Sequence, residues 1–221
     1  MAVSLPYSIV ATDVVIFSLI QNKLHVLLLE LREKPFAGKF ALPGGLVQST
    51  ETIDESVARH LQEKAGITRP YIEQVYTFGE IDRDPRGRVI SVAYMALVLE
   101  DKAKPQTIDR YAGIAWHLVS KLPSLAYDHV KIIAVAKERL VSKLAYSTIV
   151  YALLPKEFTL TQLQDTYELL LDGELDKRNF RKKVLSLGII EKTGEVEGGV
   201  KNRPAALYKF TSRSLQQVNI L

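Results

Sequence analysis

Residues that could bind a phosphate or a metal gather in the segment from Gly44 to Ile67, GGLVQSTETIDESVARHLQEKAGI. Gly44 and Gly45 permit a tight turn with positive φ and a close approach of the backbone to a ligand. A helix that follows such a turn can place carboxylates beside bound phosphate, as phosphate-and-metal chemistry requires. Two positions that favour carboxylates in this chemistry carry His60 and Lys64 instead. The segment is therefore either a working hydrolase site or a catalytic fold that serves another purpose.

The spacing of polar residues predicts a helix from residue 53 to about residue 64. Thr52 and Glu55 have the spacing of a capping box, and a glycine at position 66 follows the last helical residue. On this helix Arg59 and Glu63 are four residues apart, so we expect them to share a face and form a structural ion pair.

The segment resembles the Nudix box, whose pattern is Gly, five residues, Glu, seven residues, then Arg-Glu-apolar-any-Glu-Glu-any-Gly-apolar. Seven positions match in register, namely Gly45, Glu51, Arg59, Leu61, Glu63, Gly66 and Ile67. The resemblance implies the α/β Nudix fold, a mixed sheet sandwiched by helices. It also implies that glutamates at the Arg-Glu-x-x-Glu-Glu core would bind the divalent ions that activate water.

The chain departs from that pattern at His60 and Lys64. Hard cations such as Mg²⁺ prefer carboxylate oxygens, so an imidazole and an ammonium are poor replacements. We expect a degenerate box with no catalytic residue and no metal, whose pocket persists while hydrolysis is lost or feeble. The alternative is that His60 and Lys64 face solvent and other residues rebuild a metal site.

A charged stretch at residues 78–91, FGEIDRDPRGRVIS, precedes another strand. Its arginines could bind phosphate oxygens bidentately, and the phrase resembles one in Nudix proteins that handle ADP-ribose. Asp128, in the segment LAYDH, is expected to cap a helix. The residues expected to bind the effector are Arg32, Phe40, Gly44, Gly45, Glu63, Arg83, Arg86 and Arg88.

The first part of the chain alternates strand and helix patterns. IVATDVVIFSLI and LHVLLLEL predict a hairpin, and strands are also expected at Val89–Leu99 and Ile114–Val119. Residues 128–154 repeat apolar side chains at three- and four-residue spacing, which predicts one long helix or two abutting helices. We expect this first domain to span residues 1–150.

Residues 151–221 have the layout of a winged helix-turn-helix, with two helices and then two strands joined by a glycine-rich turn. Thr159 and Gln162 predict a capping box for the first helix, and Asp176 and Gly188 bound the second. The second helix is basic, and the turn after the first strand carries further cations. The residues expected to bind DNA are Lys177, Arg178, Asn179, Arg181, Lys182, Lys201, Asn202 and Arg203.

Composition supports an ordinary globular protein of 221 residues with a net charge of +4 and 47% hydrophobic residues. The absence of cysteine excludes disulfides, thiolate nucleophiles and cysteine-based zinc sites. No stretch approaches the roughly 20 apolar residues of a membrane helix. We therefore expect a soluble, cytoplasmic protein.

A degenerate Nudix domain before a winged helix resembles the Nudix-related transcriptional regulators, of which NrtR, the regulator of NAD metabolism, is the best-known type. The resemblance covers about residues 5–212. It implies a homodimeric repressor that binds palindromic operator DNA and needs no cofactor, with ADP-ribose as the effector that releases the DNA. The alternatives are an active ADP-ribose pyrophosphatase with an accessory domain, a regulator that senses a sugar such as arabinose, and a C-terminal domain that contacts protein.

Overall fold

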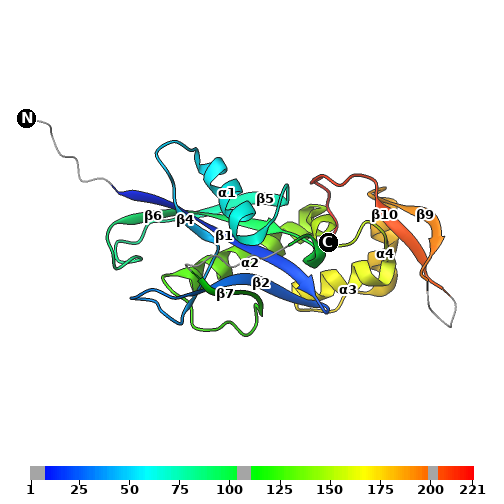
Figure 1. Cartoon of the computed structure of the whole chain (residues 1–221). Coiled ribbons are helices and arrows are strands. Elements are labelled where there is room, and N and C mark those ends of the chain that lie inside the picture. The colour runs from blue at the N-terminus through cyan, green and yellow to red at the C-terminus, as the bar shows by residue number, and fades with distance from the viewer. Residues whose placement is uncertain (1–7, 104–110, 199–203) are drawn as a thin grey trace, which may run out of the picture. The chain divides into compact units, whose positions relative to one another are not determined.

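The computed structural model describes residues 8–103, 111–198 and 204–221 (Figure 1). Its contacts divide the chain into two compact units: residues up to 18 with 25–137, and residues 19–24 with 138–221. The sequence predicts a domain limit at residue 150, beyond this contact boundary. That limit stays a prediction, because contact grouping does not by itself define a folding domain.

A mixed sheet forms the centre of the first unit, with strand order β3-β2-β1-β6-β5. Strand β1 pairs parallel with β6, and the other pairings of which the register is known are antiparallel. β4 pairs with β1, and β7 pairs with β2. The strands are β1 Ile9–Ile20, β2 Lys23–Leu31, β3 Phe40–Ala41, β4 Gly44–Leu46, β5 Tyr71–Phe78, β6 Val89–Leu97 and β7 Tyr111–Leu118. A short 3-10 helix, Glu100–Lys102, follows β6.

The predicted hairpin of β1 and β2 is confirmed. Gln21 and Asn22 both have positive φ, as a two-residue turn between twisted strands requires. The predicted strands at Val89 and Ile114 are also confirmed, although β7 begins earlier, at Tyr111. Strand β5 is an edge strand that the sequence reading left unassigned.

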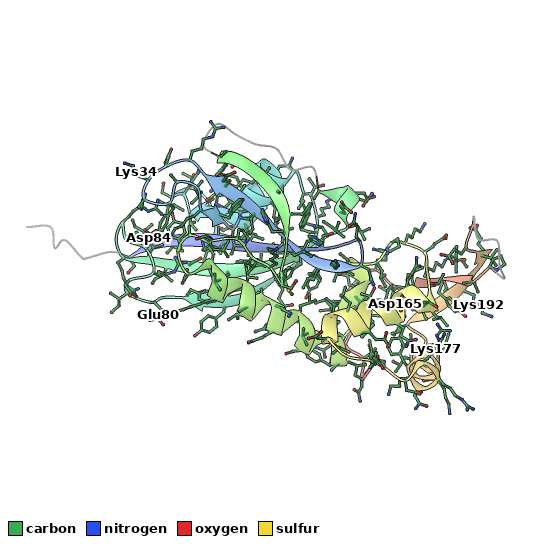
Figure 2. The ribbon with its side chains drawn as sticks, turned by 90° about the horizontal axis from the view of Figure 1, so that it is seen from below. Lys34, Glu80, Asp84, Asp165, Lys177 and Lys192 are labelled. Atoms are coloured by element: carbon green, nitrogen blue, oxygen red, sulfur yellow. The ribbon has the colours of Figure 1, made fainter. Side chains whose placement is uncertain are left out.

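Two helices cover opposite faces of this sheet (Figure 1 and Figure 2). Helix α1, Ile53–Ala65, buries Val57 and Leu61 in one core cluster with Val14 of β1. Helix α2, His129–Tyr146, begins on the other face, where it buries apolar side chains such as Ile133. Because β1 is covered on both sides, eight consecutive residues of it are buried.

Helix α1 has the ends that the sequence predicts. Thr52 Oγ1 accepts from the Glu55 amide, and the Glu55 carboxylate accepts from the Thr52 amide, so both halves of the capping box are present. Gly66 adopts the left-handed conformation after the last turn, with φ of 61°. The local signals alone therefore fix where this helix begins and ends.

A buried charge cluster ties four segments of the first unit together. Arg83, in the loop before β6, donates to both carboxylate oxygens of Asp128, at 3.0 and 2.7 Å, and lies 3.4 Å from Asp13 of β1. Ser91 of β6 donates to Asp13 at 2.6 Å, and His129 Nε2 lies 3.4 Å from the same carboxylate. Asp128 directly precedes α2 and its carbonyl oxygen accepts from the Ile132 amide at 3.3 Å, so it occupies the capping position that the sequence predicts, while its side chain binds Arg83.

Burial opposes ionisation of Asp13, but His129, Ser91 and Arg83 together hold its pKa well below the ordinary range. His129 Nδ1 accepts from the Leu42 amide at 2.9 Å. Because Nδ1 accepts this bond, Nε2 is the nitrogen that can donate, and it faces Asp13. Each polar group of the cluster thus has a specific orientation.

The second unit contains a short three-stranded sheet and two helices. Strand β8, Phe158–Thr159, lies at one edge of the order β8-β10-β9, with β9 Ile190–Val196 and β10 Ala206–Phe210. Helix α3, Leu160–Leu171, and helix α4, Lys177–Ser186, pack beside it. The 3-10 helix Ile149–Ala152 follows α2, so residues 128–154 form two helices rather than one.

The predicted starts of both helices in the second unit are confirmed. Thr159 and Gln162 form a reciprocal capping box, and Asp176 accepts from the Asn179 amide. Helix α4 ends as the sequence predicts, because Gly188 adopts the left-handed conformation, with φ of 65°, directly after the C-cap Leu187. Helix α3 ends at Asp172, which itself adopts the left-handed conformation. The layout of helix, helix and hairpin is that of a winged helix.

No helix in the described part of the chain is long and apolar enough to cross a membrane.

The charge cluster yields a stability prediction. Replacement of Arg83 by Met leaves Asp13 and Asp128 buried without their common cation, so we expect the free energy of unfolding to fall by roughly 3 to 5 kcal/mol. The matched control is Arg88→Met, in the same loop, because the Arg88 guanidinium donates to the carbonyls of Gly79 and Glu80 at an exposed position. Urea unfolding followed by circular dichroism measures both. Equal losses in the two variants would contradict the role given to the cluster.

Candidate ligand cavity and basic helix

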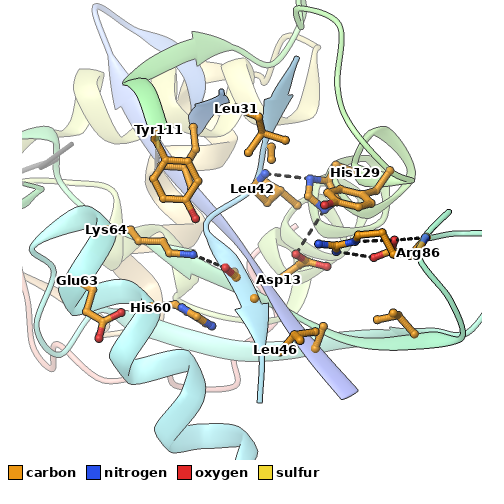
Figure 3. A pocket seen from close by; sticks show the side chains of 18 of the residues that line it. Asp13, Leu31, Leu42, Leu46, His60, Glu63, Lys64, Arg86, Tyr111 and His129 are labelled. Atoms are coloured by element: carbon orange, nitrogen blue, oxygen red, sulfur yellow. Dashed lines mark hydrogen bonds and ion pairs between the residues drawn. The ribbon is translucent and has the colours of Figure 1, made fainter. Parts of the chain in front are cut away.

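A cavity of about 450 Å³ opens in the first unit between α1, the glycine turn at β4, β7 and the start of α2 (Figure 3). Cavities of this size bind small organic ligands in many proteins. Its wall carries acidic, basic and aromatic side chains. The charged or aromatic residues that line it are Asp13, Arg59, His60, Glu63, Lys64, Arg83, Asp84, Arg86, Tyr111, Tyr127 and His129.

Gly44 and Gly45 both line the cavity, as predicted. The sequence predicts that Gly44 allows a positive φ, but the structure requires a glycine there for a different reason. A Cβ at Gly44 would lie 2.3 Å from the Thr12 carbonyl oxygen and 2.7 Å from a carboxylate oxygen of Asp13. The glycine is therefore required by close packing of β4 on β1. At Gly45 a Cβ would lie 3.1 Å from His60 Cε1, so this position keeps the space in front of α1 open.

Arg59 binds Glu51 more closely than the predicted partner Glu63. Its Nε and one terminal nitrogen donate to the two oxygens of Glu51 at 2.8 and 2.6 Å, whereas Glu63 is 3.5 Å away. The hydrogen bonds from Arg59 lower the pKa of Glu51 to about 2. Glu51, Arg59 and Glu63 therefore anchor the turn to α1, and the i,i+4 pair is the weaker of the two contacts.

His60 and Lys64 face the cavity and are buried, so the alternative in which they merely face solvent is wrong. Lys64 Nζ donates to the Gly44 carbonyl and lies 5.3 Å from the centre of the Tyr111 ring (Figure 3). Burial, together with the charges of Lys64 and Arg59, lowers the pKa of His60 to about 4. The imidazole is therefore neutral near pH 7.

These donors do not fit a divalent metal ion. Glu51 is bound to Arg59, the imidazole of His60 is neutral, and the ammonium of Lys64 repels a cation. No group of three or more His, Cys, Asp or Glu residues that could hold a metal occurs among the residues whose placement is described. Mg²⁺ prefers several oxygen ligands in octahedral geometry, and this wall does not supply them.

The arginines of the predicted effector set have different positions. Arg83 lines the cavity, but Asp128 and Asp13 hold its buried guanidinium. Arg86 also lines it; its guanidinium binds Asp84 and lies 5.4 Å from the Tyr127 ring. Both guanidiniums are thus oriented by carboxylates before any ligand arrives.

Three other predicted effector residues lie outside this cavity. Arg32 is exposed just after β2, whereas its neighbour Leu31 lines the wall. The Phe40 ring packs 4.7 Å from that of His117, and Arg88 binds backbone carbonyls of its own loop. Glu63 does line the cavity, as expected.

The charged and aromatic residues of the wall that the sequence did not predict as site residues are Asp13, Asp84, Tyr111, Tyr127 and His129. One carboxylate inside the apolar run IVATDVVIFSLI was the available signal for Asp13, because an isolated buried charge needs partners. Tyr127 and His129 lie in the segment LAYDH, of which only Asp128 was assigned a role from the sequence. Tyr111 has no comparable signal in the sequence.

Helix α4 presents its basic residues to solvent. Phe180 and Val184 are buried, while Lys177, Arg178 and Lys182 are exposed. Figure 2 labels Lys177 at the start of this helix. At 100° per residue, Arg178 and Lys182 lie nearly opposite the buried stripe. Asn179 is also exposed. These side chains are placed to reach a phosphate backbone or base edges.

Arg181 is oriented differently from the other basic residues of α4. It is only partly exposed and donates to Thr161 Oγ1 of α3 at 2.9 Å, which braces the two helices against each other. The predicted wing residues Lys201, Asn202 and Arg203 lie outside the residues that the structure describes.

Comparison with known proteins matches both parts of the chain. Residues 10–136 match the NUDIX domain, and residues 150–210 match the NrtR DNA-binding winged helix domain. An Acinetobacter baylyi protein described as an ADPR responsive transcriptional repressor, NtrR, is 36% identical over 93% of this chain and 83% of its own length. An ADP-ribose pyrophosphatase of Methanocaldococcus jannaschii is 35% identical over 54% of this chain and 70% of its own.

Among solved structures, Shewanella oneidensis NrtR complexed with a 27mer DNA superposes with a TM-score of 0.80 and 33% identity. The match covers 91% of this chain and 93% of that one. The NUDIX domain of the same protein, complexed with ADP ribose, matches with a TM-score of 0.57 over 63% of this chain and 93% of its own. The chain therefore belongs to the NrtR family of Nudix-related transcriptional regulators.

Proposed function

We propose that this protein is an ADP-ribose-responsive repressor of NAD metabolism genes, which acts as a homodimer on a palindromic operator. The observation that carries the proposal is the cavity, which keeps the glycine turn and capped helix of a Nudix box but holds His60 and Lys64 at metal-ligand positions. Such a cavity can bind a nucleotide without cutting it. The repressor and the ADP-ribose complex among the relatives support the same effector.

The second half of the proposal rests on α4. Its exposed face carries Arg178, Lys182, Lys177 and Asn179, in a winged-helix layout that matches the NrtR DNA-binding domain. Arginine and lysine side chains on a recognition helix contact phosphates and guanine, and asparagine contacts adenine.

Helix α2 is the element through which we propose that the effector acts. It begins at the cavity with His129 and continues to Tyr146, within the second unit. A ligand that contacts His129 or the Arg83 cluster differently in two conformations would shift the population between them. The proposed dimer changes its operator affinity when that population shifts.

An active ADP-ribose pyrophosphatase is the main rival, and the Methanocaldococcus relative is one. The wall speaks against it, because His60 and Lys64 stand where a Nudix box carries metal-binding carboxylates. A sugar effector is the second rival. The charged wall of the cavity favours a phosphorylated ligand, because guanidinium and ammonium groups bind phosphate strongly.

The recognition helix is tested with single alanine variants. We expect Arg178→Ala and Lys182→Ala each to lower operator affinity by roughly 10-fold and to reduce the slope of log K against log salt by about 1 where the lost contact is to phosphate. Fluorescence anisotropy on DNA upstream of neighbouring NAD-biosynthesis genes measures this. Lys102→Ala, whose side chain is 68% exposed, removes the same charge outside α4 and α2 and should leave the affinity unchanged. Normal operator binding by both α4 variants would mean that this helix does not read the DNA.

The effector is tested on the same DNA at fixed salt. Saturating ADP-ribose should lower operator affinity by at least about 10-fold, which corresponds to a coupling free energy of about 1.4 kcal/mol. Arabinose is the control ligand and should have no effect. Release by arabinose but not by ADP-ribose would replace the effector in the proposal.

Hydrolysis is tested with ADP-ribose and Mg²⁺, by following AMP and ribose 5-phosphate over time. We expect no turnover above the rate without protein, because His60 and Lys64 stand where a Nudix box carries metal-binding glutamates. Rapid production of AMP would favour the pyrophosphatase.

A further inference from the structure

We propose that residues 211–221, the C-terminal segment, link the end of helix α2 to the winged helix, so that a shift of α2 is transmitted to the DNA-binding helix α4. This inference rests on the proposed function, in that α2 responds to an effector in the cavity. It assigns the transmission to a segment that belongs neither to the cavity wall nor to α4.

The C-terminal segment starts near the end of the DNA-binding helix. It follows β10 directly and turns back along the second unit (Figure 1). The Thr211 amide donates to the Ile189 carbonyl at 2.9 Å, and the Thr211 hydroxyl donates to the Gly188 carbonyl at 3.3 Å. Gly188 follows the C-cap of α4, so these bonds hold the start of the segment at the junction of α4 and β9.

The far part of the segment binds the last turn of α2. The Val218 amide donates to the Tyr146 carbonyl at 2.9 Å, and the Ile220 amide donates to the Ala145 carbonyl at 2.8 Å. The last carbonyls of an α-helix have no partner within the helix, so the segment supplies donors that the helix end needs. The Ile220 side chain is 3% exposed, so apolar burial also anchors this contact.

The middle of the segment binds the connection between α2 and β8. Thr148 is buried in this connection; its amide donates to the Gln216 carbonyl and its Oγ1 accepts from the Gln216 amide, both at 3.0 Å. Arg213 is exposed, and its guanidinium donates to three carbonyls in and after the 3-10 helix, those of Tyr151 at 2.8 Å, Leu154 at 3.2 Å and Pro155 at 3.3 Å. The segment thus follows the connection from the end of α2 to residue 155.

Two chain segments therefore join α2 to the winged helix, in place of the connection 147–157 alone. A single connection can bend at a few residues and act as a hinge, whereas a second attachment restricts that bending. The division of the chain agrees with this, because residues 138–146 of α2 belong to the same unit as the winged helix. Helix α2 is continuous from His129 at the cavity to Tyr146, so one helix carries a shift of its start to the segment.

The test is the operator affinity with and without saturating ADP-ribose, measured by fluorescence anisotropy at fixed salt. The natural protein should lose affinity by at least about 10-fold when the ligand is added. A chain that stops after Thr211 loses every attachment of the segment to α2, so we expect ADP-ribose to change its operator affinity by less than about 3-fold. Without ligand this shortened chain should still bind the operator, because it keeps α4 and the strands of the winged helix.

A second variant keeps the full length of the chain. Arg213→Met/Thr148→Val removes the guanidinium and the buried hydroxyl but leaves side chains of similar size, and it should also reduce the effect of ADP-ribose to less than about 3-fold. Lys156→Met is the matched control, because it removes one exposed positive charge beside the same connection. It should keep the full effect of ADP-ribose. Any loss of a DNA contact by this control lowers both affinities and cancels in their ratio.

Two further measurements separate transmission from stability. Isothermal titration of each variant with ADP-ribose should give a dissociation constant within about twofold of that of the natural protein, because the cavity wall is unchanged. Thermal unfolding followed by circular dichroism shows whether each variant is folded. A segment that only stabilises the fold would lower the unfolding temperature when it is removed and leave the effect of ADP-ribose unchanged.

The outcomes separate this inference from the proposed function. A full effect of ADP-ribose in the folded shortened chain or in the folded double variant would overturn the role of the C-terminal segment and leave the proposed function in place. Loss of operator binding by the double variant without ligand would also overturn it, because the segment would then serve the DNA contact itself. Operator binding by the natural protein that ADP-ribose does not change would overturn the effector and this inference together.

Discussion

The position of the cavity depends on the buried pairing of Arg83 with Asp128 and Asp13. Buried ion pairs contribute little net stability, because the cost of removing both charges from water offsets their attraction. Their geometric effect is larger, since a group left unpaired is strongly unfavourable. Here one guanidinium fixes the loop before β6, the strand β1 and the residue that precedes α2. The start of α2 is thereby held at the cavity wall.

The same constraint determines how the wall can meet a ligand. The sequence predicts that Arg83 and Arg86 bind phosphate. In the structure Asp128 orients Arg83 and Asp84 orients Arg86, so each guanidinium is a preformed hydrogen-bond donor whose charge is partly offset by its carboxylate. Preorganised donors lose little entropy when a ligand binds. The glycine turn is likewise fixed by packing against Thr12 and Asp13. The cavity therefore has a fixed frame, in which Lys64 is buried beside the neutral imidazole of His60.

Local features of the fold could be predicted from the sequence, and contacts between distant residues could not. Thr52 with Glu55, Thr159 with Gln162, and Asp176 each mark a helix start through bonds that span three residues. The partner of Arg83 is 45 residues away and the partner of Lys64 is 20 residues away, so no local pattern encodes them. The helical spacing predicted Glu63 as the partner of Arg59, but the main partner is Glu51. Glu51 accepts two hydrogen bonds from the guanidinium, and this bidentate geometry is stronger than a single contact with a helical neighbour. Phe40 does not line the cavity whereas its neighbour Ala41 does, because side chains of successive strand residues alternate in direction.

A sensor and a hydrolase place opposite demands on the same cavity. To move an operator-binding equilibrium, a ligand must favour one conformation by its differential affinity, and a nearly complete shift from 1:99 to 99:1 needs about 5.5 kcal/mol. Hydrolysis would consume that ligand while it is bound. A metal-dependent site would also make the response follow the metal concentration. The wall keeps the glycine turn and the capped helix but has His60 and Lys64 in place of carboxylates, so it does not supply the oxygen ligands that a metal-dependent hydrolase needs.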